Sequence, residues 1–222
     1  MDDTPNNEFA NPDFEREARW GLPEVVLGIG KTDAQIAEIV GRLKERNSGP
    51  VLVTKTTCAA YEAVLAVAPE AEFFDHAKLI RLPRPPVVSA GTVGVIAAGT
   101  ADLPVAEEAA LTAEAGGASV DRIYDVGVAG LHRLMDRLDR IRMCDALIVV
   151  AGMEGALPTV VAGVTGLPVV AVPTSVGYGT SLGGVAALLG MLNSCTPQVV
   201  AVNIDNGFGA GFFAALVTRK TA

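Results

Sequence analysis

The fold is decided by the stretch Ala146-Leu-Ile-Val-Val-Ala-Gly-Met-Glu-Gly-Ala-Leu-Pro158. Its first five residues are continuously apolar, which is typical of a strand buried on both faces, and a glycine-bearing turn follows. The same pattern recurs along the chain, and four further strands are expected at residues 93–98, 122–126, 169–172 and 199–204. Each is followed by a turn and a helical stretch. This alternation predicts a three-layer, doubly wound parallel sheet of the flavodoxin or Rossmann type, with right-handed crossovers.

The clearest helix is expected at residues 131–142, where apolar side chains recur on one face and charged ones on the other. Helices of this kind cover both faces of a doubly wound sheet. Ligands of such sheets bind outside the carboxyl ends of the strands. We therefore look for function in the loops that follow the strands.

A smaller α/β domain is expected before this sheet, over residues 15–86. Strands at 24–30 and 51–54 alternate with helices, and Thr32 with Gln35 forms the sequence pattern of a capping box. Two short extended pieces near Phe73 and Leu79 complete it. Residues 1–14 are polar and rich in Pro and Asn, which predicts a loose tail. The proline-rich segment 81–86 predicts a linker, so that the catalytic domain spans residues 87–222.

Charge and cysteine content exclude several classes of partner. The 222 residues carry 17 Lys and Arg against 25 Asp and Glu, a net charge of −8, which argues against nucleic acid or an anionic membrane as the partner. Residues 146–218 hold only Glu154 and Asp205 as charged groups, and prolines interrupt their apolar runs. We interpret this stretch as core plus oligomer interface. The three cysteines are odd in number and widely spaced, which favours a reducing cytoplasm.

Two loops after strands carry candidate polar groups. Gly99-Thr-Ala-Asp-Leu-Pro104 offers backbone N–H groups to a phosphate, and Asp102 either caps the next helix or contacts a ligand. In Ala151–Pro158, Glu154 is the lone charge, and it either caps a helix or transfers a proton as a desolvated carboxylate.

Other loops and turns contain further candidate ligand-binding residues, and each has a simpler structural explanation. Residues 173–184 are rich in hydroxyls and glycines and contain Ser175 and Tyr178; the alternative is a flexible turn. Asp205 and Asn206, in the loop 203–211, are placed to meet a ribose or a metal, although one Asp is weak evidence for a metal. Gly28–Thr32 lacks the glycine spacing of a Walker motif, so Lys31 is a phosphate contact or a neighbour of the capping box.

Cys195 follows an apolar helix, and the two histidines stand outside these loops. A lone cysteine is usually a small apolar residue, and the negative end of a helix dipole opposes a thiolate. A cationic ring over the sulfur reverses that effect. His132 lies near the start of the amphipathic helix and His76 lies in the small domain, and for both the pattern favours a surface position over a catalytic one.

Six motifs in order resemble the LarB proteins of nickel-pincer cofactor biosynthesis, and residues 19–32 are similar as well. The motifs are residues 99–109, 124–133, 150–158, 172–179, 191–195 and 202–211. The family's carboxyl-terminal domain is similar to the PurE-type aminoimidazole ribonucleotide carboxylases, which carry a histidine in an Ala-Gly-Gly-Ala-Ala-His-Leu-Pro loop. Here that position is Ala156, and a carboxylate, Glu154, stands two residues earlier.

The resemblance implies pyridinium-3,5-biscarboxylic acid mononucleotide synthase activity. Such an enzyme carboxylates nicotinic acid adenine dinucleotide at ring C5 and hydrolyses its phosphoanhydride to release AMP. It implies that Cys195 forms a covalent adduct at C4 and that Glu154 removes the C5 proton. The substrate-binding residues it implies are Gly99, Thr100, Asp102, Asp125, His132, Gly152, Met153, Ser175, Tyr178, Asn206 and Lys31. CO₂ or bicarbonate is the co-substrate, Mg²⁺ is the expected cofactor with unknown ligands, no organic cofactor is bound, and the chains form an octamer.

Two departures and two rival hypotheses accompany this resemblance. Ala101 stands where the family commonly has serine, and Lys55 where it commonly has arginine, so individual phosphate contacts are in doubt. A PurE-type carboxylase or mutase would need no covalent step and would tolerate Cys195→Ser. A non-catalytic nucleotide-binding scaffold would bind nucleotide without turnover.

Overall fold

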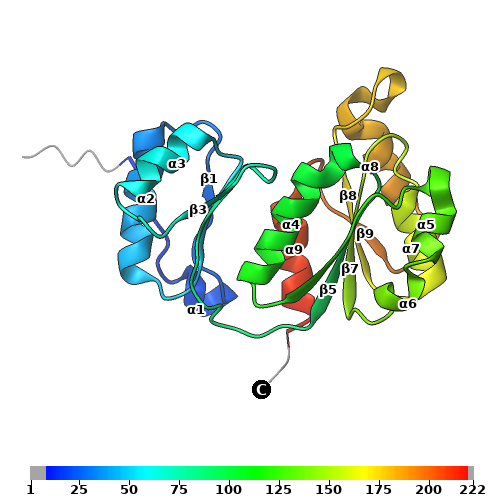
Figure 1. The fold of residues 1–222 in the computed structure, drawn as a ribbon, viewed down its shortest axis with the longest axis horizontal. Coiled ribbons are helices and arrows are strands. Elements are labelled where there is room, and N and C mark those ends of the chain that lie inside the picture. The colour runs from blue at the N-terminus through cyan, green and yellow to red at the C-terminus, as the bar shows by residue number, and fades with distance from the viewer. Residues whose placement is uncertain (1–8, 220–222) are drawn as a thin grey trace, which may run out of the picture.

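The computed structural model describes residues 9–219, which form two sheets with a pair of helices between them (Figure 1). The first sheet has the order β1-β2-β4-β3, with β1 and β2 parallel and the other pairs antiparallel. Its strands are β1 (Val26–Leu27), β2 (Val51–Thr54), β3 (Glu72–Phe74) and β4 (Leu79–Leu82). The helices of this part are α1 (Arg16–Trp20), α2 (Asp33–Arg46) and α3 (Cys58–Leu65).

The second sheet is parallel throughout and has the order β6-β5-β7-β8-β9. Its strands are β5 (Thr92–Ala97), β6 (Ser119–Ile123), β7 (Ala146–Ala151), β8 (Val169–Pro173) and β9 (Val199–Ala201). Its helices are α4 (Leu103–Ala115), α5 (Leu131–Met135), α6 (Leu138–Ile141), α7 (Leu157–Thr165), α8 (Val185–Leu192) and α9 (Gly207–Val217). The doubly wound parallel sheet expected from the sequence is thereby confirmed.

Helices cover both faces of the parallel sheet. Successive side chains of a strand point to opposite faces, so each central strand packs against both helical layers. In β7, Ile148 and Val150 face α4 and α9, whereas Leu147 and Val149 face the layer of α5 to α8. All six residues of β7 are buried. The continuous apolar run that opened the sequence analysis is therefore the central strand of the core.

The prediction of a single helix over residues 131–142 is wrong. It divides into α5 and α6, because the amide of Arg137 donates to the carbonyl of Leu134 rather than continuing the α-helical pattern. Leu134 and Ile141 are nevertheless both fully buried against the sheet. The apolar periodicity correctly predicted which side chains are buried. The break between the two short helices lets both of them pack against the sheet.

Other element boundaries differ by a few residues. The second expected strand of the parallel sheet starts earlier, as β6, and the last one ends earlier, as β9. Arg81 and Leu82 belong to β4 rather than to irregular chain, so only residues 83–86 of the expected linker lack regular structure. The capping box at Thr32 and Gln35 is confirmed. Residues 1–8 of the expected tail lie outside the described residues, and Ala10 and Phe14 pack against the first sheet's core.

The helices α4 and α9 form a layer between the two sheets (Figure 1). They pack so closely that a Cβ on Gly211 would lie 2.3 Å from the carbonyl oxygen of Ala109. Their outer side shares a cluster with the first sheet, in which Leu111 and Phe212 contact Leu52 and Leu79. The small sheet is thus anchored by apolar packing to the back of the layer that covers the large one. Within residues 9–219, no helix is long and apolar enough to cross a membrane.

An ion pair with a fully buried carboxylate joins the two parts. Lys55, directly after β2, places its Nζ 2.8 Å from Oε2 of Glu108 on α4 and donates to the carbonyl oxygen of Asp205 at 2.7 Å. Glu108 is fully buried, and its Oε1 has no hydrogen-bond partner. Burial raises the pKa of the Glu108 carboxyl, and the hydrogen bond from Lys55 offsets part of that rise.

We expect Lys55→Met to lower the free energy of unfolding by about 3 kcal/mol at pH 7.5, because it leaves a buried carboxylate without its cation. The deficit shrinks toward pH 4.5. Since the folded-state pKa of Glu108 is raised, folding favours its protonated form, and the stability it gives at low pH is lost as the pH rises through that pKa. Urea denaturation at the two pH values measures both effects.

Lys78→Met is the matched control. Lys78 shares the positive φ of Lys55, at 48° against 53°, but its partner Asp75 is exposed, so the loss stays below about 1 kcal/mol. Equal losses for the two variants would contradict a special role of the buried pair.

Candidate active site

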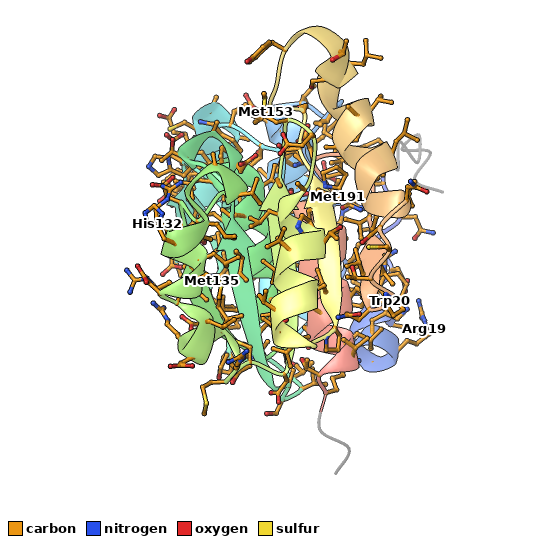
Figure 2. All side chains as sticks on the ribbon, turned by 90° about the vertical axis from the view of Figure 1, so that its right-hand side faces the viewer. Arg19, Trp20, His132, Met135, Met153 and Met191 are labelled. Atoms are coloured by element: carbon orange, nitrogen blue, oxygen red, sulfur yellow. The ribbon has the colours of Figure 1, made fainter. Side chains whose placement is uncertain are left out.

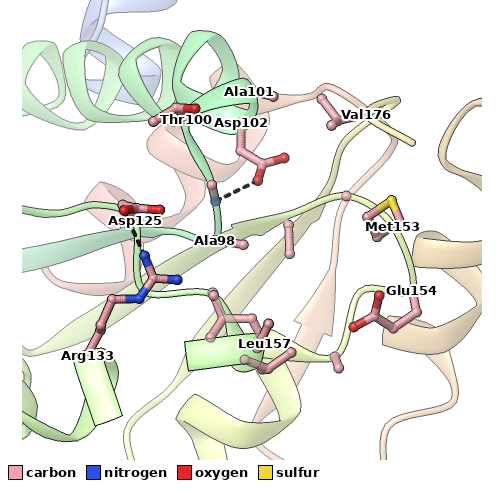
Figure 3. Close-up of a pocket in the computed structure, with 17 residues that line it drawn as sticks. Ala98, Thr100, Ala101, Asp102, Asp125, Arg133, Met153, Glu154, Leu157 and Val176 are labelled. Carbon is pink, nitrogen blue, oxygen red and sulfur yellow. Dashed lines mark hydrogen bonds and ion pairs between the residues drawn. The ribbon is translucent and has the colours of Figure 1, made fainter. Parts of the chain in front are cut away.

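A cavity of about 520 Å³ lies at the carboxyl ends of β5, β6, β7 and β8, where a doubly wound sheet binds its ligands. The loops after these strands form its walls (Figure 3). Seven of the residues singled out in the sequence line it together: Gly99, Thr100, Asp102, Asp125, Gly152, Met153 and Glu154. Three separate motifs therefore converge on one site.

Asp102 is buried in the wall of this cavity and does not cap α4. Its Oδ2 accepts a hydrogen bond from the amide of Gly99 at 3.0 Å, and its Oδ1 accepts one from Thr174 Oγ1 at 2.7 Å. Burial raises the pKa of the Asp102 carboxyl, and these hydrogen bonds offset part of the rise. The carboxylate thus ties the loop after β5 to the end of β8.

The loop after β7 is held in a tight turn that presents Glu154 at the cavity. Met153 and Gly155 both have positive φ, at 53° and 68°, so the chain reverses within three residues. Glu154 is exposed in the single chain, in contrast to the desolvated carboxylate expected from the sequence, because this turn lifts it clear of the sheet core. In Figure 3 its carboxylate is turned toward the other lining residues. A base at this place is accessible to a ligand.

The opposite wall carries an ion pair that the sequence analysis missed. Nη1 of Arg133 on α5 donates to Oδ2 of Asp125 at 2.7 Å, and both side chains line the cavity (Figure 3). The sequence pattern places Arg133 on the charged face of the helix expected at residues 131–142. The signal that would have found it is its place at the end of the motif 124–133. His132, beside it, is exposed and does not line the cavity, and Figure 2 shows it at the outer edge of the molecule.

Four other predicted residues lie outside the cavity. The Ser175 amide donates to Asp205 Oδ1 at 2.8 Å, and Asn206 Oδ1 caps α9 by accepting from the amide of Gly209. Tyr178 is 80% exposed. Lys31, in the first part of the chain, donates to the carbonyl oxygen of Leu27. In the single chain these four residues serve turns and caps or face solvent.

Cys195 is exposed beyond the end of α8 and does not line the cavity. The preceding helix does reach the cavity's edge, since a Cβ on Gly190 would lie 2.8 Å from the carbonyl oxygen of Glu154. The neighbouring Ser194 shares a hydrogen bond of 2.7 Å with Thr159 on α7. The cysteine therefore lies beyond the helix that touches the Glu154 turn, and it is not among the residues that line the cavity.

The described part of the chain contains no group of three His, Cys, Asp or Glu side chains that could hold a metal ion. Asp102 and Asp205 already accept hydrogen bonds from the protein, and Asp125 is paired with Arg133. The side chains present do not form a cage for Mg²⁺, and we derive no step through a protein-bound metal.

Two family models match consecutive parts of the chain. The LarB/PurE-like N-terminal domain matches residues 4–84, and AIR carboxylase matches residues 92–221. The chain belongs to the LarB/PurE-like family. This membership agrees with the parallel sheet and with a cavity at its carboxyl edge.

Relatives within this family differ in how much of the chain they match. An uncharacterized protein of Methanocaldococcus jannaschii is 42% identical over 221 residues, which is 93% of this chain and 83% of the relative. The N5-carboxyaminoimidazole ribonucleotide mutase of Thermotoga maritima is 31% identical over 131 residues, 56% of this chain and 73% of that enzyme. The corresponding mutase of M. jannaschii is 33% identical over 124 residues, 54% of this chain and 74% of the enzyme. The LarB/PurE-like chain is thus of the carboxylase and mutase type. Its N-terminal domain, residues 4–84, precedes the part that matches AIR carboxylase.

The tight turn before Glu154 requires glycine at position 152. A Cβ there would lie 2.3 Å from the carbonyl oxygen of Val176 and 2.7 Å from Thr174 Oγ1. We expect Gly152→Ala to cost about 2 kcal/mol of unfolding free energy, since the loops after β7 and β8 must separate. Gly163→Ala on α7 is the control. Nothing lies within 4 Å of its added Cβ, and alanine stabilises a helix by up to about 1 kcal/mol. Thermal unfolding compares the two, and equal melting temperatures would contradict the close approach.

Proposed function

We propose that the chain carboxylates the pyridinium ring of nicotinic acid adenine dinucleotide at C5 and hydrolyses the phosphoanhydride, giving pyridinium-3,5-biscarboxylic acid mononucleotide and AMP. The observation that carries the proposal is the composition of the cavity. It is lined by three carboxylates, of Asp102, Asp125 and Glu154, with the single cation Arg133, and no histidine is among the lining residues. This lining suits a cationic ring and lacks the imidazole of a PurE-type proton transfer.

The chemistry needs a nucleophile, because C5 of a pyridinium does not attack CO₂. Addition of the Cys195 thiolate at C4 forms a C–S bond and moves the ring electrons to N1, leaving an enamine across C5 and C6. C5 then attacks CO₂, forming the new C–C bond and an iminium at C6. The ring at this stage carries its C5 proton beside the new carboxylate.

Glu154 completes the substitution in this scheme. Its carboxylate takes the C5 proton, which restores the enamine, and the enamine electrons expel the thiolate from C4 to regenerate the pyridinium. The net change is C–H to C–CO₂⁻ with one proton transferred to Glu154, and no oxidant is consumed. Water then cleaves the P–O–P bond, and AMP leaves. Any Mg²⁺ in the reaction travels with the diphosphate.

A substrate ring must lie between Glu154 and Cys195, at the outer lip of the cavity. Glu154 is exposed there, and the backbone of α8 touches its turn at Gly190. The face of α8 beside it is apolar and exposed at Val185, Leu189 and Leu192. We place a second copy of the chain against this face, which closes the lip and removes water from the ring. The octamer expected from the family resemblance supplies such contacts.

The decisive assay mixes the protein with nicotinic acid adenine dinucleotide, bicarbonate and Mg²⁺ and measures AMP and a mononucleotide heavier by one CO₂ by mass spectrometry. We expect Cys195→Ala to lose at least about 10³-fold in the rate of both products, since the proposed adduct at C4 needs its thiolate. Cys58→Ala is the matched control, an exposed free cysteine on α3. Turnover of an aminoimidazole ribonucleotide by Cys195→Ala would instead favour a PurE-type mutase.

We also expect Leu189→Glu, a charge in the middle of the exposed α8 face, to dissociate the oligomer. Light scattering at micromolar concentration measures the mass. A wild-type mass of 22.8 kDa, that of one chain, would contradict the packing of a second copy on α8. Val67→Glu, an exposed apolar position in the first part, is the control and leaves the mass unchanged.

A further inference from the structure

A second cavity, of about 320 Å³, lies between the two parts of the molecule. The turn between β3 and β4 forms one wall with Phe74, Asp75 and His76, and α4 with the end of β6 forms the other. Figure 1 shows this turn reaching toward the start of α4. The cavity exists only because the small sheet is docked on the large one, and the reaction scheme above makes no use of it.

The second cavity shares its walls with the first. Leu103 lines the second and its neighbour Asp102 the first, and Tyr124 lines the second while the next residue, Asp125, lines the first. The two cavities are therefore on opposite sides of the same two chain segments. A ligand with two bulky ends and a flexible middle can fill both at once by crossing the loop after β5.

The lining of the second cavity suits a nucleoside. Phe74 offers an aromatic surface that is held in place by Arg81, whose guanidinium lies 4.8 Å from the ring centroid. Glu107 is also fixed, because Oε1 accepts from the Tyr124 hydroxyl at 2.8 Å and Oε2 from Arg122 Nε at 3.2 Å.

Acceptors outnumber cations on this lining. Asp75 and Glu107 are both carboxylates, and His76 is the one basic side chain among the lining residues. Burial raises the pKa of the Tyr124 hydroxyl, so it stays a donor to Glu107. Carboxylates accept hydrogen bonds from ribose hydroxyls and an exocyclic amine, and aromatic rings stack on a purine base.

We propose that this cavity binds the adenosine of the dinucleotide and that the diphosphate crosses the loop 99–102 into the first cavity. The inference rests on the proposed function for the identity of the two-ended substrate. It gives the first sheet a task in the reaction, since Phe74, Asp75 and His76 hold the half of the substrate that leaves as AMP. It also explains why the catalytic sheet is joined to a second sheet at this edge.

The chain has two histidines, which makes NMR a direct test on the unmodified protein. His76 lines the second cavity and His132 stands beside the first, so their Cε1–H resonances report the two places separately. His132→Gln assigns the signals. We expect AMP or adenosine to shift the His76 resonance and leave that of His132 in place, and ribose 5-phosphate to shift neither. Phe74→Leu should weaken AMP binding at least tenfold, with the His132 signal confirming the fold.

Three results would overturn the inference: AMP that moves neither resonance, AMP that moves His132 alone, or ribose 5-phosphate that moves His76 as strongly as AMP does. The test separates this inference from the proposed reaction. A His76 shift without carboxylation in the assay above keeps the adenosine site and rejects the synthase. Carboxylation without a His76 shift keeps the synthase and rejects this site.

Discussion

Burial of both faces of a parallel sheet is the constraint on which the rest of this structure depends. With α4 and α9 on one side and α5 to α8 on the other, the central strands β5, β7 and β8 are buried from end to end, except for the first residue of β5. Along these three strands polar groups are confined to the ends, because an unpaired polar group within the core would be costly. The carboxyl edge collects them from four loops, and the result is one cavity with carboxylates at three of its sides.

The same constraint explains how the first sheet and its helices are connected to the site. The outer side of the α4 and α9 layer is apolar and is covered by the first sheet. From there Lys55 reaches the carbonyl of Asp205, whose carboxylate accepts from the Ser175 amide. The adjacent Thr174 donates to Asp102 in the cavity wall. A continuous set of hydrogen bonds and peptide links thus connects the small sheet to the catalytic loops.

The sequence predicted the sheet and most of its helices, because these depend on local patterns of apolar residues and glycines. Asp102 and Glu154 were predicted from their places in the loops after strands, whereas Asp125 and Met153 came from the family resemblance. It did not predict the break near Arg137, since the apolar period continues unchanged through it. Arg133 was not predicted as a site residue, because a charged residue on an amphipathic helix is usually solvent-exposed. Its contact with Asp125 depends on how the neighbouring loop folds. The position of Cys195 outside the cavity follows from how α8 packs on the Glu154 turn, which is a tertiary contact with no local signal. For the same reason, the sequence does not predict the cavity between the two sheets.

The central claim is that one ligand meets Glu154 and Cys195 at the lip of the cavity. A crystal structure of Glu154→Gln with nicotinic acid adenine dinucleotide and bicarbonate tests it most directly, because the variant can form the C4 adduct but cannot remove the C5 proton. The account predicts a bond from Cys195 Sγ to ring C4, with the ring beside residue 154. A ring bound elsewhere, or an unmodified Cys195 with a fully occupied ligand, would contradict it.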